Sequence, residues 1–320
     1  MNRKEFGRLI SVLRKERFRT ASEFAFAVDA EFQISKSDAE TNEFINENMI
    51  AKLESGGSVK LTPELVNCIA TALGLLIFER RELFYAVNGF GNRFAYKKQM
   101  TEREQAIHSK MIRDELTTIL NAMVMPSFLT DNYGDIVACN IQAPIFLDID
   151  VDQLLKNRQI LGKSNIDPNL MEIVYDPESK FLDLVGEIKS QYAISNMMTF
   201  RTMSLRYRHH KYFRDLYNRL TKIPQFNTYW RQTSHSNNDY HTEAERFKYK
   251  NRRFGFVDYV VNSSISITPL GDLHLFVYAP TNQDTLKIFQ EIYMGVQNQK
   301  TKVLQLANWP KTQEQMSWDS

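Results

Sequence analysis

The chain has 320 residues, of which 43% are hydrophobic and 24% charged, and its formal net charge is +2. This composition is that of an ordinary globular protein with room for about two domains. The two cysteines, Cys68 and Cys139, lie far apart and offer neither a disulfide framework nor zinc-ligand spacing, which fits a reducing cytosol. The longest apolar run, residues 69–78, is too short to span a bilayer, and no apolar secretory core follows the N-terminus. We therefore expect a soluble, cytoplasmic protein that does not insert into membranes.

Hydrophobic periodicity and capping signals predict five short helices over residues 1–90. The first is amphipathic, because apolar residues recur at spacings of three and four while cations crowd the opposite face. Its apolar residues are Phe6, Leu9, Ile10 and Leu13. The second begins at the capping box Thr20-Ala21-Ser22-Glu23, and the third covers about 45–54 and ends at glycines 56 and 57. The fourth begins at Thr62-Pro63, and the fifth covers about 78–87. These elements predict a compact all-α domain.

The third and fourth of these helices carry a family resemblance. The run Asn48–Gly56, followed by Pro63-Glu64-Leu65 and Ile69–Gly74, resembles the XRE, or lambda-repressor-like, helix-turn-helix family over residues 3–90. In that family the helix ending in Leu-Glu-x-Gly lies in the major groove of DNA and the next helix packs behind it. The resemblance therefore implies double-stranded DNA as a partner, bound by a dimer.

The same resemblance implies which side chains contact DNA. Asn and Lys present donors suited to base edges, whereas hydroxyls, free backbone amides and arginines suit phosphates. The implied base-reading residues are Asn46, Glu47, Asn48 and Lys52. The implied phosphate contacts are Arg17, Arg19, Thr20 and Ser22. For each single residue, a merely solvated helix face remains the alternative.

An acidic insert separates the second and third helices, where the family has a short turn. The insert covers residues 30–44, and from Ala21 to Gly56 eight acids face two bases, a net charge of −6. Binding to duplex DNA depends on neutralising phosphates, so this charge is unfavourable. It favours a second hypothesis, in which the helical domain of a sensor contacts a protein partner instead of DNA.

The second half predicts an α+β domain over residues 105–300, after a linker over 91–104 and before a tail over 301–320. A helix capped at Thr101 precedes two strands around the turn Asp131–Gly134, and a short helix follows over 141–147. Three later β-rich runs lie at 259–261, 264–267 and 273–278, after a helical stretch over about 168–230. These runs indicate an antiparallel sheet with inserted helices. The basic run 246–253 is interpreted as an exposed loop.

This half resembles the PAS-like ligand-binding domain of MmyB-like regulators over about residues 105–295. The resemblance rests on these segments: Asp131–Asn140, Phe200-Arg201, Arg206–His209, Phe213–Leu216, Pro224–Phe226, Tyr229-Trp230 and Leu275–Pro280. It implies a pocket for a small apolar molecule such as a fatty acid. The candidate lining residues are Phe128, Val137, Cys139, Phe146, Met197, Met198, Phe200, Ile265, Ile267 and Phe276. Ordinary core packing is the alternative for each of them.

A cationic cluster around Arg201, from Arg201 to Arg214, is compatible with three roles. It could hold the carboxylate or phosphate of a ligand, contact DNA, or form a solvated helix face. Arg201 is taken as the ligand-binding member.

No catalytic constellation is recognisable. The sequence holds no Gly-rich phosphate loop, no His-Glu-x-x-His and no Gly-x-Ser-x-Gly, and its histidine pairs lack a carboxylate at metal-site spacing. We therefore expect no enzyme, no metal and no cofactor other than a bound apolar molecule. The sequence as a whole predicts a multidomain, ligand-responsive transcriptional regulator, with a protein-binding sensor as the alternative.

Overall fold

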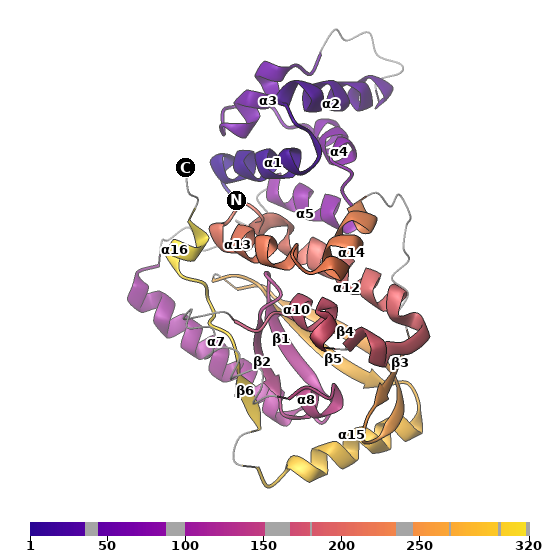
Figure 1. Ribbon diagram of the computed structural model, residues 1–320. Coiled ribbons are helices and arrows are strands. Elements are labelled where there is room, and N and C mark those ends of the chain that lie inside the picture. The colour runs from indigo at the N-terminus through magenta and orange to yellow at the C-terminus, as the bar shows by residue number, and fades with distance from the viewer. Residues whose placement is uncertain are drawn as a thin grey trace.

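The computed structural model describes residues 1–35, 44–87, 100–150, 167–179, 181–234, 246–268, 270–299 and 302–317. An N-terminal helical domain lies against one end of an α+β domain, and Figure 1 shows α5 of the first beside α12, α13 and α14 of the second. The coarse order predicted from the sequence, helices and then an α+β domain, is confirmed.

The helical domain consists of α1 (Arg3–Arg17), α2 (Ala21–Ser35), α3 (Glu47–Glu54), α4 (Pro63–Ala72) and α5 (Ile77–Val87). Side chains cap their N-termini as the sequence predicts: Thr20 and Glu23 form a reciprocal pair before α2, and Thr62 accepts from the amide of Leu65 in α4. The helix α2 runs to Ser35, farther than the sequence indicated. The rest of the acidic insert, residues 36–43, lies outside the described part of the chain.

Close packing of α1 on the C-terminal end of α3 fixes the core of this domain. A Cβ on Gly7 would lie 2.4 Å from the carbonyl oxygen of Leu53, so only glycine permits this approach. Arg14 of α1 makes two hydrogen bonds to Glu54, with Nε–Oε1 at 2.6 Å and an Nη2–Oε2 distance of 3.1 Å. Gly56 then ends α3 with φ of +81°. In the structure, the Leu-Glu-x-Gly motif therefore packs α3 against α1 and ends α3.

A six-stranded antiparallel sheet, in the order β3-β4-β5-β1-β2-β6, forms the centre of the α+β domain. Its strands are β1 (Ser127–Asp131), β2 (Ile136–Asn140), β3 (Arg246–Asn251), β4 (Gly255–Ser266), β5 (Leu273–Pro280) and β6 (Val303–Gln305). The first and fifth strands pair in register from Ser127↔Val277 to Asp131↔Leu273. Because β1 lies beside β5, segments that are distant in sequence meet at the middle of the sheet.

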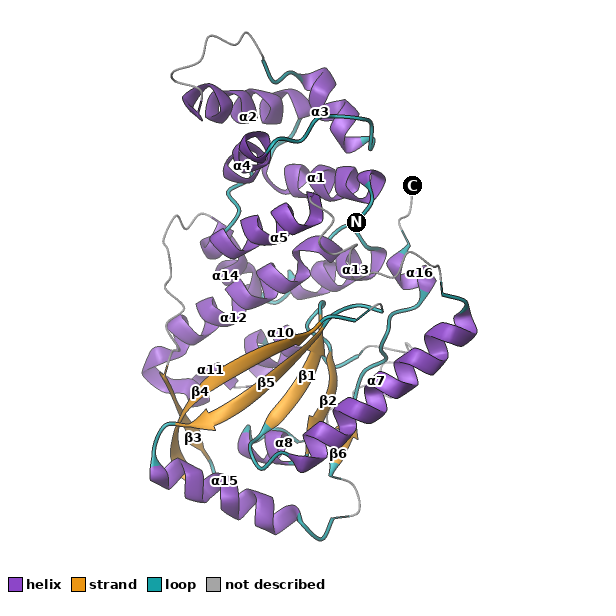
Figure 2. Cartoon of the chain, turned by 180° about the vertical axis from the view of Figure 1, so that it is seen from behind, coloured by secondary structure: helices purple, strands orange, loops and turns teal. Residues whose placement is uncertain are grey.

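Helices cover both faces of the sheet. On one face, α7 (Glu102–Ala122) packs Leu116 and Leu120 against Leu129, Val137 and Trp309, and Figure 2 shows it crossing the strands. The other face is covered by α8 (Gln142–Phe146), α10 (Leu170–Tyr175), α11 (Phe181–Val185), α12 (Lys189–Ser204), α13 (Lys211–Leu220), α14 (Pro224–Ser234) and α15 (Gln283–Val296). Short 3-10 turns, η1 (Pro177–Ser179), η2 (Gly186–Ile188) and η3 (Leu205–Tyr207), join some of these helices, and α16 (Gln313–Met316) follows β6.

Three elements differ from the sequence interpretation. The basic run 246–253 is β3 and the start of its hairpin with β4, not an exposed loop: Phe247, Tyr249 and Asn251 are buried while the intervening cations point outward. The predicted strands over 259–261 and 264–267 are one strand, β4. Residues 301–320, predicted as a tail, contribute β6 and a buried lysine, Lys311. Within the described residues, no helix is long and apolar enough to cross a membrane.

Candidate functional site

A cavity of about 360 Å³ lies between α12 and the sheet. Its apolar wall is formed by Phe128, Leu170, Met171, Phe200, Met203, Phe247, Val261 and Phe276. Its polar wall is formed by Ser195, Asn196, Thr199, Asn262 and Ser263, with the rings of Tyr192 and Tyr278 completing the lining. This volume falls in the range of about 300–1,000 Å³ typical of small-molecule sites.

A smaller, wholly apolar pocket of about 40 Å³ adjoins this cavity. The two share Phe128, Leu170 and Tyr278, and the smaller one also contacts Cys139 of β2. Burial raises the pKa of the Cys139 thiol to about 12, so it lines the pocket as a neutral, apolar group. Together the two spaces form a site with an apolar inner end and a polar outer end.

Four of the predicted ligand residues line these spaces: Phe128, Phe200 and Phe276 line the larger cavity, and Phe128 and Cys139 the smaller pocket. Phe128 and Phe276 meet because β1 pairs with β5, and their rings stack with centroids 5.0 Å apart. Cys139 lies opposite Phe128 on β2, and Phe200 comes from α12.

The other predicted ligand residues lie elsewhere. Phe146, Met197 and Met198 are buried in the core without lining either space. Val137 lies on the opposite face of the sheet, under α7, because it is the extra residue where the pairing of β1 with β2 shifts register, between Leu129↔Ala138 and Thr130↔Ile136. Ile265 and Ile267 lie at and beyond the end of β4 and are 55% and 65% exposed.

Arg201 is bound by a carboxylate of the protein itself. Its Nε lies 3.2 Å from Oε1 of Glu79 in α5, and Arg208 Nη2 lies 2.5 Å from the same oxygen. Both guanidinium groups stack on Trp230, at 4.7 and 4.9 Å from a ring centroid. Arg201 therefore joins the two domains, and it is not among the described residues that line the cavity. The interpretation of Arg201 as a ligand-binding residue is wrong.

This buried ion cluster is stable at neutral pH. Burial alone raises the pKa of Glu79, but the attraction of Arg201 and Arg208 outweighs it, so the pKa lies below its ordinary value and the carboxylate stays charged. The backbone amide of Leu76 also donates to Glu79, at 2.9 Å. Beside the cluster, Leu205 of η3 is fully buried in the core of the helical domain.

A second ionic link lies at the edge of the same interface. Arg206 of η3 contacts Glu82 of α5, with Nε–Oε2 at 3.0 Å, and Asp272 before β5, with Nη2–Oδ2 at 2.8 Å. The interface thus contains three arginines from one short segment of the α+β domain, each paired with a carboxylate of α5.

One helix connects the cavity to this interface. Along α12, the side chains of Asn196, Thr199, Phe200 and Met203 line the cavity, while Arg201 holds Glu79. The sequence interpretation missed Asn196, Thr199 and Met203, although their spacing of three and four placed them on one helical face with Phe200. It also missed Glu79, because nothing local in the sequence pairs it with Arg201.

The predicted DNA-contacting residues lie at the surface of the helical domain, and α3, which carries several of them, is far from the sheet in Figure 1. Glu47, Asn48 and Lys52 are exposed on α3, and Asn46 precedes it as the N-cap, accepting from the amide of Met49. Arg17, Arg19, Thr20 and Ser22 are exposed around the junction of α1 and α2.

An apolar stripe also lies on the surface of this domain. Phe26 and Ile34 occur eight residues apart on α2 and are 78% and 72% exposed, and Phe44, before α3, is 66% exposed. Exposed large apolar side chains grouped in this way are typical of protein contact surfaces.

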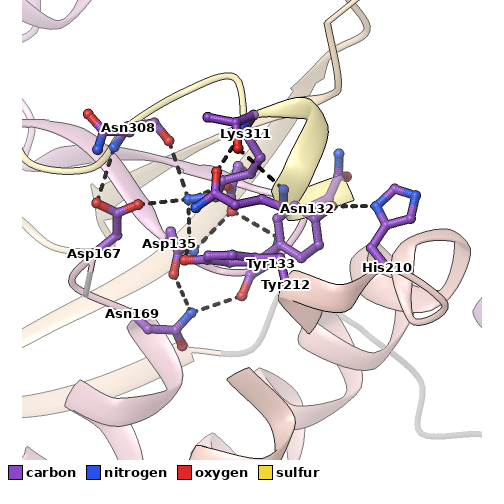
Figure 3. A network of polar contacts seen from close by, with 12 residues as sticks. Asn132, Tyr133, Asp135, Asp167, Asn169, His210, Tyr212, Asn308 and Lys311 are labelled. Carbon is purple, nitrogen blue, oxygen red and sulfur yellow. Dashed lines mark hydrogen bonds and ion pairs between the residues drawn. The ribbon is translucent and has the colours of Figure 1, made fainter. Parts of the chain in front are cut away.

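A third polar network anchors the C-terminal segment (Figure 3). Lys311 is buried, and its Nζ lies 2.6 Å from Asp135, 2.9 Å from Asp167 and 3.3 Å from Asp131. Burial and the neighbouring Asp135 raise the pKa of Asp131 to about 7, although Lys311 opposes this shift. The attraction of the carboxylates overcomes burial and raises the pKa of Lys311, so the ammonium stays charged. This network ties the segment after β6 to the β1–β2 turn.

Comparison with protein-family models returns no match, and comparison with curated proteins also returns none.

Proposed function

We propose that this protein is a ligand-responsive, DNA-binding transcriptional regulator. Its helical domain reads DNA through α3, and the cavity beside α12 binds a small, largely apolar molecule. The observation that carries the proposal is the position of α12, which lines the cavity with Phe200 and holds the helical domain through Arg201. A ligand that shifts α12 would change where α3 lies relative to the α+β domain. It would therefore favour either the DNA-binding or the non-binding conformation of the protein.

The α+β domain would act as a PAS-like sensor. Its antiparallel sheet, the helices inserted between β2 and β3 and the cavity on one face are the features this role needs. The helical domain would act as an XRE-type reader, since it contacts the α+β domain through α5 and through Glu16 of α1, whose Oε2 lies 4.0 Å from Arg208 Nη1, and these contacts leave Asn48 and Lys52 on α3 exposed. A homodimer would place two α3 helices about one DNA turn apart.

Retention of DNA as a function of salt tests the DNA-binding part of the proposal. Purified full-length protein is mixed with genomic fragments, beginning with DNA upstream of its own gene, in a gel-shift titration. We expect selective retention that weakens as salt rises, because bound cations displace counterions from phosphates. Retention without selectivity for any fragment, or affinity independent of salt, would overturn the proposal.

The second candidate function is a sensor whose helical domain binds another protein. The observation that favours it is the exposed apolar stripe of Phe26, Ile34 and Phe44. A partner captured from cell extract by the wild type, and lost with Phe26→Ser and Ile34→Ser, together with failure to retain DNA, would favour this function over the first.

A further inference from the structure

The proposed function leaves open what kind of molecule the cavity accepts. In protein sites, an acidic head such as that of a fatty acid is typically held by charge-assisted hydrogen bonds from a cation, which are about twice as strong as neutral ones. Among the described residues that line the cavity, none is a lysine, an arginine or a histidine. The nearby guanidinium of Arg201 is bound to Glu79 and Trp230.

The polar wall of the cavity is instead made of neutral groups. Ser195, Thr199 and Ser263 offer hydroxyls, and Asn196 offers an amide oxygen and one N–H besides the one that it donates to the carbonyl oxygen of Tyr192. The side chain of Asn262 points to the other face of the sheet, with that of its partner Val277, because side chains alternate along β4. The other residues come from two elements, α12 and β4, that face each other across the opening. Thr199 and Ser263 are exposed, so the polar wall is also the outer end of the site.

The inner end is apolar. Phe128 and Leu170 line both the cavity and the adjoining smaller pocket, whose other walls are aliphatic and aromatic side chains and the neutral thiol of Cys139. A flexible hydrocarbon chain suits such a space, since Met171 and Met203 adapt their shape to their contacts.

We infer that the cavity binds an uncharged amphiphile, a molecule with a hydrocarbon tail and a neutral hydrogen-bonding head such as an amide or a hydroxyl. The tail lies on Phe128 and Phe276 and extends toward Cys139, and the head contacts Asn196, Thr199 and Ser263. This inference rests on the proposed function, in which the ligand in the cavity regulates DNA binding, and it names the chemical class of that ligand.

Calorimetric titration of the full-length protein with decanamide and with decanoate, at about pH 8, tests the inference, because the two probes differ chiefly in the charge of the head. We expect decanamide to bind at least about ten times more tightly, a difference of about 1.4 kcal/mol. Asn196→Leu and Thr199→Val are expected to remove most of this preference without removing binding of the tail.

The variant Ser263→Lys, which adds a cation at the opening of the cavity, provides a complementary test. Because Ser263 is exposed, this change is compatible with folding, and a lysine at the opening is expected to improve decanoate binding while leaving decanamide nearly unchanged. Tighter or equal binding of decanoate by the wild type would overturn the ligand class but leave the regulator proposal standing. Absence of binding by both probes would overturn the cavity as an amphiphile site, whatever the protein does with DNA.

Discussion

Single residues at the contact between α1 and α3 determine how α3 is held. Arg14 is buried and makes two hydrogen bonds to Glu54, and Gly7 lets the backbones of the two helices touch. Charge-assisted hydrogen bonds of this two-pronged kind are among the stronger ones in proteins. The orientation of α3 therefore depends on α1 as well as on its own sequence.

Gly7→Ala is expected to destabilise the helical domain, although alanine is ordinarily better than glycine in a helix by about 1 kcal/mol. The added Cβ would lie 2.4 Å from the carbonyl oxygen of Leu53, so α1 must move away from α3. Gly295→Ala in α15 is the matched control, since its Cβ meets nothing within 4 Å. Scanning calorimetry should show a lower unfolding temperature for the first and an equal or higher one for the second; the same shift in both would contradict this explanation.

Lys311→Met is expected to destabilise the α+β domain by about 3–5 kcal/mol, since it leaves three buried carboxylates without a cation. The pKa of Asp131 is about 7 in the folded protein, against 3.8 in the absence of burial. The folded state therefore binds the extra proton between about pH 4 and 7, and stability falls as pH rises through this window.

Removing Lys311 takes away the charge that lowers the pKa of Asp131, so this pKa rises further and the loss should be larger at about pH 8 than at about pH 5. Urea unfolding followed by tryptophan fluorescence measures it, because Trp230, Trp309 and Trp318 all lie in the second half of the chain. Lys302→Met serves as the control, since Lys302 is partly exposed and donates only to Gln297 among the contacts described. An equal loss at both pH values would contradict the role given to Asp131.

At the scale of elements, local signals in the sequence predicted what short-range physics determines. The caps at Thr20, Thr62 and Thr101 and the glycine end of α3 were all readable, because each depends on neighbours within four residues. The alternation of Phe247 and Tyr249 with cations is typical of a strand. The high charge of this run nevertheless led to its interpretation as an exposed loop, and β3 was missed.

Elements and pairs that depend on distant partners could not be predicted. The strand β6 has only three residues, and its pairing with β2 becomes evident only in the folded sheet. The same holds for Glu79 with Arg201 and for Lys311 with Asp135, which are distant in sequence. Four cavity residues were predicted, because Phe128, Cys139 and Phe276 lie in apolar strands that the sequence indicated and Phe200 lies in the predicted helical stretch. The polar wall was missed, since isolated Asn and Ser residues carry no such signal.

Under the proposed function, the exposed face of α3 carries sequence discrimination. Asn48→Ala is expected to weaken binding to the best retained fragment by about 1–3 kcal/mol and to relax the preference at one base pair, because an amide can pair with an adenine edge. Asn67→Ala, the same change at an exposed position of α4, is the control and should leave affinity within about twofold. Equal effects of the two substitutions on a panel of mutated fragments would argue against α3 as the reading element.

At the scale of the whole molecule, the buried cluster of Glu79, Arg201 and Arg208 decides whether the two domains stay together. Its members are nearly or fully buried, and Leu205 of one domain completes the core of the other. Breaking one partner of a buried ion cluster leaves an uncompensated charge, which costs more than an exposed pair would.

Glu79→Gln is therefore expected to separate the domains without unfolding either. Small-angle X-ray scattering should show a larger radius of gyration than for the wild type, while circular dichroism stays unchanged. Glu64→Gln, at an exposed position on α4, is the control and should leave both signals unaltered. A compact Glu79→Gln protein with the wild-type radius would show that the ion cluster does not hold the interface.

The most direct test of the central claim measures DNA affinity with the cavity open and with it filled. The affinity of the wild type for its best retained fragment is determined with and without a lipid extract of cells, beside the variant Ser263→Trp, whose indole occupies the opening of the cavity. We predict that the extract changes the Kd of the wild type by about fivefold or more, the usual size of coupling between two sites, and leaves that of the variant unchanged. No change in the wild type, or the same change in both proteins, would contradict the claim that this cavity controls the DNA-reading domain.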